Sequence, residues 1–395
     1  MSGLRRDNQR DWSVKTTSRE ENRHLKAIIC ERIRQRGKIP FSEFMELCLY
    51  HPIHGYYQTG REKIGKKGDY YTSASVHPVF GRLLGRQLRE MGGFLEERPF
   101  WLVEAGAGRG SLAADILADL AQDSPVLFDR VRYGILERSP SFIEEQKARL
   151  EPYRGKVEWL DLQEVQEGGL QGCFFANEFI DAFPVHRVMV KGGRIREVYV
   201  TEEDGAFCEV LGEPCSEEIS RYLDGMAIRL EEGQQAEVNL EIARWYDQVG
   251  RVLRRGFILI IDYGYLAQDL YVCDRPSGTL LCYYRHTCSS DPYTHIGFQD
   301  ITSHVNFTDL IKKGESLGFQ LTGFVPQYQF LLSLGFLGQI SRQKDKGLSS
   351  DESLMERLTM KHLILPDGGM GDTFKVLIQH RGIDHVRLTG LQPLG

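Results

Sequence analysis

The sequence lacks the features that mark several large classes of protein. Its 395 residues contain no apolar run near the roughly 18 residues that a membrane-spanning helix needs. The first ten residues have no apolar stretch suited to a signal peptide, and Asp7 and Asp11 are unlike a mitochondrial transit peptide, which avoids acids. There is no internal repeat and no low-complexity tract. These absences predict a cytoplasmic protein with no membrane insertion.

Metal and nucleic acid signatures are also missing. The eight cysteines form no C-x-x-C pair, and their spacing fits no structural zinc pattern. We therefore expect reduced thiols, no metal site and a reducing compartment. The formal net charge of −6 argues against a nucleic-acid-binding protein, because binding to the phosphate backbone needs a basic protein surface. None of these features predicts an oligomeric state.

The chain divides into three regions by pattern. Residues 1–17 are polar and predict a flexible N-terminus. Residues 18–98 are expected to form a region of helices and loops that covers the ligand site. One helix is predicted to be capped by Ser18 and a second to begin at Ser42, followed by a loop rich in glycine, lysine and tyrosine. From 99 to 385, apolar strands alternate with helices, at 101–103, 132–136, 157–160, 173–176, 257–262 and finally 374–380. This alternation predicts an α/β fold with a mostly parallel sheet.

Two segments interrupt the alternation and are expected as insertions, at 187–235 and 265–306. The first includes a predicted hairpin over 187–211 that turns at Gly192–Gly193. The second is rich in Tyr, His, Asp and Gly with little periodicity, which is typical of a binding loop or lid. A polar, linker-like stretch runs from Ser341 to Glu352.

A glycine-rich turn carries the strongest chemical signal. Glu104 is followed by Gly106, Gly108 and Gly110, between a predicted strand and a predicted helix. Glycine there lets the backbone approach a ligand where a Cβ would collide. Dinucleotide sites need G-x-G-x-x-G, but this chain has Ser111 where the third glycine would stand. The order acid-x-G-x-G-x-G instead resembles motif I of the class I methyltransferases, whose fold is Rossmann-like. That resemblance implies S-adenosyl-L-methionine as cofactor, with Glu104 near its methionine part.

Two further acids follow later strands. Glu137 lies at the tip of the second strand, one βαβ unit after the glycine turn, where a carboxylate can accept both ribose hydroxyls. Asp161, just past the third strand, is a candidate for the adenine end of the cofactor.

Several longer segments resemble the MidA-like family, bacterial relatives of the protein arginine methyltransferase needed for assembly of mitochondrial respiratory complex I. The segments are 44–57, 68–73 with Phe80-Gly81, 104–112, 176–186, 261–264, 299–305 and 370–376. The resemblance implies a methyltransferase for arginine in a protein substrate. A small-molecule methyltransferase and an assembly or chaperone factor for a respiratory complex remain alternatives, and a nicotinamide enzyme is a more distant one. The family's usual Thr-Ser-Pro-Glu is replaced by Thr72-Ser73-Ala74-Ser75, which puts substrate choice in doubt.

The candidate catalytic residues follow the fourth strand. Glu178 and Asp181 share a face if that segment turns helically, and two carboxylates can grip a guanidinium and accept its proton. They could instead be helix caps or surface acids. The shared segment adds Asn177 and His186 as candidates lining the site. Asp69, in the N-terminal loop, is a candidate for closing over the cofactor.

Overall fold

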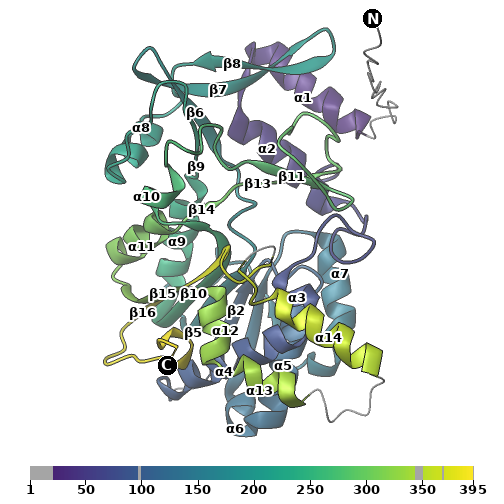
Figure 1. Ribbon diagram of the computed structural model, residues 1–395, viewed down its shortest axis with the longest axis vertical. Helices are drawn as coiled ribbons and strands as arrows, with labels where there is room; N and C mark the ends of the chain where they lie inside the picture. Colours follow the sequence, from purple (N-terminus) through teal and green to yellow (C-terminus); the bar gives the residue numbers. More distant parts are fainter. Residues whose placement is uncertain (1–20, 97–98, 343–349, 367–368, 395) are drawn as a thin grey trace, which may run out of the picture.

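A twisted central sheet with helices on both faces forms the body of the protein (Figure 1). The computed structural model describes residues 21–96, 99–342, 350–366 and 369–394. In spatial order the strands are β15 (Gln320–Pro326), β16 (Phe374–Arg381), β10 (Leu253–Tyr265), β5 (Leu170–Asn177), β2 (Phe100–Ala105), β3 (Val131–Leu136) and β4 (Val157–Trp159), with the short β14 (Val305–Asn306) paired to β10. The run from β10 to β4 is parallel, whereas β16 is antiparallel to both its neighbours. This is the mostly parallel α/β sheet that the alternating pattern predicts.

Apolar residues on both faces hold this sheet between two helical layers. In β2, Phe100 and Leu102 enter one core cluster with the helices α4 (Val79–Gly93) and α5 (Ser111–Asp123). Val103 and Ala105 enter a second cluster with α9 (Glu241–Val252) and α11 (Phe307–Ser316). Burial on both faces explains why these strands are nearly continuous apolar runs rather than alternating ones.

The order of the strands creates a crevice at one edge of the sheet. The chain passes from β2 to β3 and β4, then returns to place β5 on the other side of β2. Ligands of open α/β sheets bind at such a reversal, outside the carboxyl ends of the strands. Ala105 pairs with Ala176 at the ends of β2 and β5, so the segments that follow them lie side by side.

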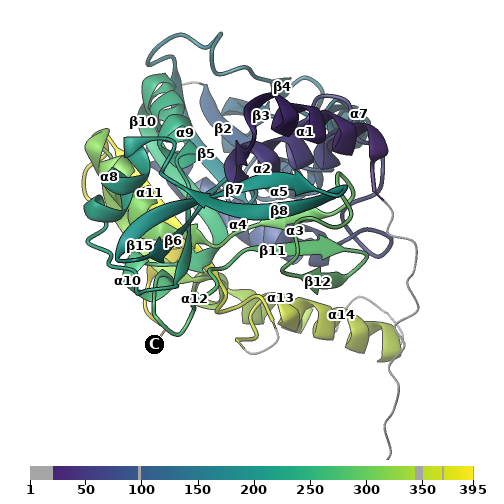
Figure 2. The same ribbon diagram turned by 90° about the horizontal axis from the view of Figure 1, so that it is seen from above.

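A second group of elements lies above the carboxyl ends of the sheet (Figures 1 and 2). It contains α1 (Arg23–Arg36), α2 (Phe41–Tyr50) and an antiparallel sheet of β1 (Ile39–Pro40), β7 (Arg194–Glu203), β6 (His186–Lys191), β9 (Gln235–Val238) and β8 (Ala206–Gly212). The predicted hairpin is present, because β6 and β7 turn at Gly192–Gly193. Residues of α1 and α2 share one core with Val185, just before β6, and with Val200 and Cys282 of the insertions.

Three sequence predictions need correction. The first helix begins at Arg23 and is capped by Asn22, whose side chain accepts the Leu25 N–H; Ser18 lies outside the described residues. The second begins at Phe41 with Pro40 as its cap, one residue earlier than expected. Residues 265–306 are not irregular: they contain α10 (Ala267–Leu270) and a small antiparallel sheet of β11 (Leu281–Tyr284), β12 (Thr287–Ser289) and β13 (Asp300–Thr302). These strands are too short for a periodic signal to appear in the sequence.

The remaining helices are α3 (Ser73–Val76), α6 (Pro125–Arg130), α7 (Pro140–Arg149), α8 (Glu217–Gly225), α12 (Gln327–Ser333), α13 (Phe336–Arg342) and α14 (Ser350–His362). The predicted linker at 341–352 overlaps the last two residues of α13 and the first three of α14, so it is wrong at both ends; its middle, residues 343–349, lies outside the described part, as do residues 1–17. None of the helices in the described part has the length and apolar character needed to cross a membrane.

Candidate active site

The glycine turn after β2 is shaped for close approach of a ligand. Gly106, Gly108 and Gly110 all have positive φ, at 70°, 51° and 73°. A Cβ on Gly106 would stand 2.5 Å from Cδ2 of Phe179, so side chains are excluded there by space as well as by conformation. Gly110 serves as the N-cap of α5, and the first residues of that helix, Ser111 and Leu112, line the crevice. The turn therefore presents backbone to whatever binds at the sheet edge.

Glu104, the last acid of β2, is buried and held by a tyrosine. Its Oε2 accepts a hydrogen bond of 2.6 Å from the hydroxyl of Tyr133 on β3. Burial raises the pKa of the Glu104 carboxyl to about 7, although the Tyr133 bond opposes the shift. Among the described residues, Tyr133 and Glu137 are the groups that act on this carboxyl, and neither is a cation, so it is available to a cationic ligand in the crevice.

Glu137, directly after β3, is oriented by its own backbone. Its Oε1 accepts the N–H groups of Arg138 and Ser139, each at 2.9 Å, and its Oε2 accepts from Gln146 at 3.2 Å. The Gln146 amide also donates to the carbonyl of Gly108 at 2.8 Å and accepts from the Trp159 indole N–H. Gln146 thus fixes Glu137 relative to the glycine turn. Sequence reasoning missed Gln146, because a buried glutamine on an amphipathic helix carries no distinguishing pattern.

A cavity of about 430 Å³ joins these residues into one site. It runs along the crevice and is walled by the N-terminal loop, by α3 and by the segments after β2, β3 and β5. Residues that line it include Glu104, Gly106, Gly108, Glu137, Asn177, Glu178, Tyr50, Tyr57, Tyr70, Ala74 and Ser75. Four cofactor candidates and two catalytic candidates from the sequence are thereby brought together.

Glu178 follows β5 in a strained conformation. Its φ of 51° is unusual for a residue with a side chain and places the carboxyl against the cavity wall. Oε1 accepts hydrogen bonds from the backbone N–H of Ser73 at 2.7 Å and from Nδ2 of Asn177 at 3.0 Å. Burial raises the pKa of the Glu178 carboxyl to about 8. Backbone strain that the surroundings maintain in this way is characteristic of functional sites.

Asp181 lies behind Glu178 in a turn organised by a third acid. Oδ2 of Asp262, on β10, accepts the backbone N–H groups of Phe179, Ile180 and Asp181 at 3.0 to 3.3 Å. The Asp181 Oδ2 accepts a hydrogen bond of 2.5 Å from the hydroxyl of Tyr263. Burial raises the pKa of the Asp181 carboxyl to about 6. Burial and the nearby charge of Asp181 hold the pKa of the Asp262 carboxyl well above its usual range.

The carboxyl groups around this end of the cavity have no cationic partner among the described residues. Within the described residues, no ion pair neutralises Glu178, Asp181 or Asp262, and the acceptors Asn177 Oδ1 and Asp181 Oδ1 are buried without a hydrogen-bond partner. Such groups are costly to bury unless a ligand satisfies them. A cationic ligand rich in N–H donors would offer a counter-charge to Glu178 and donors to Asn177, both of which line the cavity.

Tyrosines that the sequence reasoning did not select close the opposite wall. Tyr50 donates to the carbonyl of Ala182 at 2.8 Å and stacks on Tyr57 with ring centroids 5.4 Å apart. The Tyr57 hydroxyl donates to both carboxylate oxygens of Asp300, at 2.8 and 3.0 Å. Tyr50 and Tyr57 both lie in the family-like segment 44–57, but no local pattern in that segment marks them as part of a cavity wall.

The departure at Ala74-Ser75 preserves the local structure. Thr72 caps α3, with its Oγ1 accepting the Ser75 N–H at 3.2 Å and the Ser75 Oγ accepting the Thr72 N–H at 2.8 Å. This reciprocal pattern is the capping box, which glutamate at the same position also makes. Ser75 therefore keeps the cap, while the cavity wall that Ala74 and Ser75 form loses a carboxylate.

Three predicted site residues lie elsewhere. Asp161 is exposed and caps its own turn by accepting the Gln163 N–H, so it does not reach the cavity. Asp69 is fully buried by Tyr56, Arg61 and the backbone of Arg285, and it orders the loop rather than lining the cavity. His186 turns away from the cavity toward β7, because its strand belongs to the second sheet.

Comparison with known proteins adds to this geometry. A family model described as an S-adenosyl-L-methionine-dependent methyltransferase matches residues 83–325. A mitochondrial protein from Caenorhabditis elegans, named protein arginine methyltransferase NDUFAF7 homolog, is 28% identical over 91% of this chain and 86% of its own length. Protein arginine methyltransferase NDUFAF7 from Homo sapiens is 25% identical over 91% of this chain and 83% of its own length.

A solved structure shares the whole architecture. The crystal structure of a protein from Burkholderia thailandensis superposes with a TM-score of 0.83 and 31% identity, over 93% of this chain and 94% of the other. That protein is bound to S-adenosyl-homocysteine.

Proposed function

Because the chain belongs to this family of S-adenosyl-L-methionine-dependent methyltransferases, we propose that it methylates arginine side chains of a protein. The observation that carries the choice of arginine is the acidic end of the cavity, where Asn177 and Glu178 line the wall and Asp181 is buried behind them. The names of the curated relatives support the same substrate class.

We assign S-adenosyl-L-methionine, the cofactor, to the other end of the cavity, which the glycine turn, Glu104 and Glu137 line. The glycine turn lines this end at Gly106 and Gly108, and Gly106 packs so closely on the Phe179 ring that a side chain there would displace the turn. Glu137, held with its carboxylate toward the cavity, can accept ribose hydroxyls, and buried Glu104 can face the cationic methionine end. When bound, the cofactor supplies an electrophilic methyl group on a sulfonium.

The acids at the other end solve a difficulty that a guanidinium poses. Its pKa of about 12.5 or more makes prior deprotonation at pH 7 cost roughly 7 kcal/mol. A carboxylate that holds the guanidinium can instead accept its proton as the new C–N bond forms. Glu178 lines the cavity and is fixed by Ser73 and Asn177, so we assign it that role. Asp181, behind it and held by Tyr263, adds negative charge that stabilises the cation.

Protonation of Glu178 is coupled to binding of this cation. Its raised pKa keeps the carboxyl neutral at pH 7 when no cation is near. A positive charge within about 4–6 Å lowers a carboxyl pKa by roughly 1–3 units, which returns Glu178 to the ionised form that can accept a proton.

The test is labelling of a cell lysate with methyl-labelled S-adenosyl-L-methionine. The full chain should place label in the protein fraction, and Glu178→Gln should abolish that label while still binding S-adenosyl-homocysteine. Label confined to small molecules would instead support a metabolite methyltransferase. Normal in-cell function of Glu178→Gln would support an assembly factor that does not need catalysis.

For location, we propose a reducing compartment, the cytosol being our expectation. All eight cysteines are free, which suits such a compartment. The printed names of the curated relatives are mitochondrial, and the matrix is also reducing, so thiol state alone does not separate the two. Fractionation of the source cells would decide between them.

A further inference from the structure

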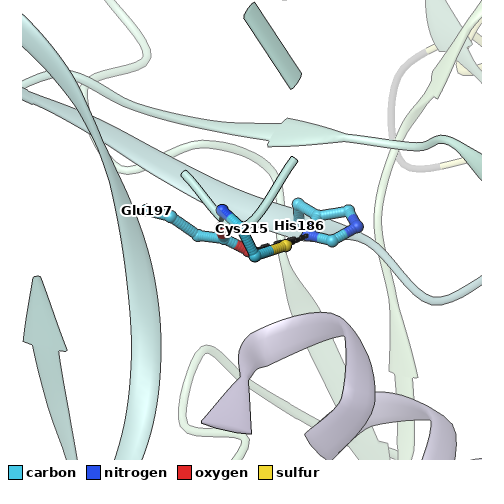
Figure 3. A group of neighbouring side chains, drawn as sticks. All are labelled: His186, Glu197 and Cys215. Carbon is cyan, nitrogen blue, oxygen red and sulfur yellow. Dashed lines mark hydrogen bonds and ion pairs between the residues drawn. The ribbon is translucent and has the colours of Figure 1, made fainter. Parts of the chain in front are cut away.

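Three side chains of different chemistry converge in the second sheet, outside the methyl-transfer site. Nδ1 of His186 on β6, a carboxylate oxygen of Glu197 on β7 and Sγ of Cys215 in the loop before α8 all lie within 4.8 Å of one another (Figure 3). None of the three is among the described residues that line the cavity. The methyl-transfer reaction proposed above gives this cluster no role.

Three contacts of the cluster meet at one imidazole nitrogen. His186 Nδ1 lies 2.7 Å from Glu197 Oε1, 3.8 Å from Cys215 Sγ and 3.3 Å from Ser42 Oγ. Cys215 Sγ is in turn 3.5 Å from Glu197 Oε1. A single nitrogen has one proton or one lone pair, so it can make only one good hydrogen bond to these three partners.

This geometry excludes a catalytic relay. In a cysteine or serine relay, the histidine contacts the nucleophile through one ring nitrogen and the acid through the other. Here the thiol and the carboxylate approach the same nitrogen. Donor atoms that converge on one point, as these do, are instead typical of the ligands of a single metal ion.

The separations fit a tetrahedral ion. With zinc bonds of about 2.3 Å to sulfur and about 2.0–2.1 Å to nitrogen and oxygen, ligand atoms stand roughly 3.3–3.6 Å apart. The two distances from Cys215 Sγ, 3.5 and 3.8 Å, are close to this. The His186–Glu197 distance of 2.7 Å has to widen by about half an ångström. The mixed N, O and S donors favour zinc over magnesium or calcium, which take oxygen ligands.

We propose that His186, Glu197 and Cys215 bind one zinc ion, with water as the fourth ligand near Ser42. The ion would join β6, β7 and the loop before α8, and so hold the second sheet together beside the site. Cysteine spacing could not reveal it, because the ligands are 11 and 18 residues apart and only one is a cysteine. A plain hydrogen-bond cluster, in which Glu197 also accepts the Cys215 N–H, is the competing explanation.

Cobalt titration of the full metal-free chain tests the proposal. Cys215 is exposed, so Cys215→Ser should fold normally, and Cys288→Ser is the matched control at another exposed cysteine. The wild type and Cys288→Ser should bind one equivalent of Co²⁺ with a sulfur-to-cobalt charge-transfer band that zinc removes. Cys215→Ser should lose the band and weaken binding at least tenfold. A hydrogen-bond cluster alone predicts no band in any variant, and a band that survives in Cys215→Ser would also overturn the assignment.

A second readout uses stability. One equivalent of zinc should raise the melting temperature of the wild type and of Cys288→Ser, because a ligand that binds only the folded chain stabilises it. An equal rise in Cys215→Ser would contradict the site. Neither readout depends on methyl transfer, so the proposal stands or falls separately from the proposed function.

Discussion

The backbone N–H of Ser73 donates to Oε1 of Glu178 across 2.7 Å, joining the N-terminal loop to the end of β5. The two residues are 105 positions apart in the chain. This bond holds a strained glutamate against the cavity and places α3 over it. It explains how a region outside the α/β sheet forms part of the site.

Replacing Glu178 by glutamine should separate binding from catalysis. Glutamine keeps an acceptor for the Ser73 N–H but can neither accept a proton nor neutralise a cation. Methyl transfer should fall by about 10²–10⁴-fold, while affinity for S-adenosyl-homocysteine changes little. Calorimetry and a methyl-transfer assay measure the two effects. Asp161→Asn, at an exposed acid, is the control and should be unchanged; equal loss in both variants would refute the assignment.

The pH dependence of ligand binding follows from the same carboxyl. Glu178 has a folded-state pKa of about 8, whereas an unfolded glutamate titrates near roughly 4.3. Between these values the folded chain binds more protons than the unfolded chain, so this group's contribution to stability falls as pH rises through that window. Binding of a guanidinium substrate should lower the pKa of Glu178 again, so that the carboxyl releases a proton on binding at about pH 6–7. Calorimetry in buffers of different ionisation enthalpy should detect that release in the wild type and not in Glu178→Gln.

The sequence predicts two acids at the adenosine end of the cofactor, Glu137 and Asp161, and variants of each test the two predictions separately. Glu137 lines the cavity and is held there by three hydrogen bonds, whereas Asp161 is exposed and outside it. Glu137→Ala should weaken S-adenosyl-homocysteine binding by about 10–100-fold, the range for a hydrogen bond to a charged group. Asp161→Ala should leave the dissociation constant within about twofold. A larger change in the dissociation constant of Asp161→Ala would show that Asp161 does contribute to cofactor binding.

A side chain at Gly106 should distort the glycine turn that lines the cofactor end of the cavity. Its φ of 70° disfavours any Cβ, and that Cβ would meet Phe179 at 2.5 Å. Gly106→Val should therefore abolish cofactor binding, with a loss of stability of about 1–3 kcal/mol but a folded chain. Gly155→Ala is the control, because nothing lies within 4 Å of its added Cβ. Unchanged affinity in Gly106→Val would contradict the role of the turn.

Restoring the family's residues at α3 tests the altered wall. The double change Ala74→Pro with Ser75→Glu keeps the capping box with Thr72, so helix and cofactor affinity should persist. It adds a carboxylate to the cavity wall, so KM for the substrate should shift while S-adenosyl-homocysteine binding stays within about twofold. A change in cofactor affinity larger than that in KM would show that the wall faces the cofactor instead.

Much of the sheet and of the cofactor end follows from local sequence patterns. Apolar runs predict the strands, and the positions of Gly106 and Glu137 relative to those strands place them at the crevice. The substrate end depends on contacts distant in sequence. Tyr57 and Asp300 are 243 residues apart, and no local pattern predicts their hydrogen bond. The family-like segment suggests that His186 lines the site, but it cannot show which way the side chain points. In the structure that side chain faces Glu197 in the second sheet.

The identity of the methylated residue tests the central claim most directly. Protein labelled by this chain and S-adenosyl-L-methionine can be hydrolysed to amino acids and analysed by mass spectrometry. We predict that the label is recovered as methylated arginine and is absent when Glu178→Gln replaces the wild type. Recovery of the label on another amino acid, in amounts that depend on Glu178, would contradict the assignment of the acidic end to a guanidinium.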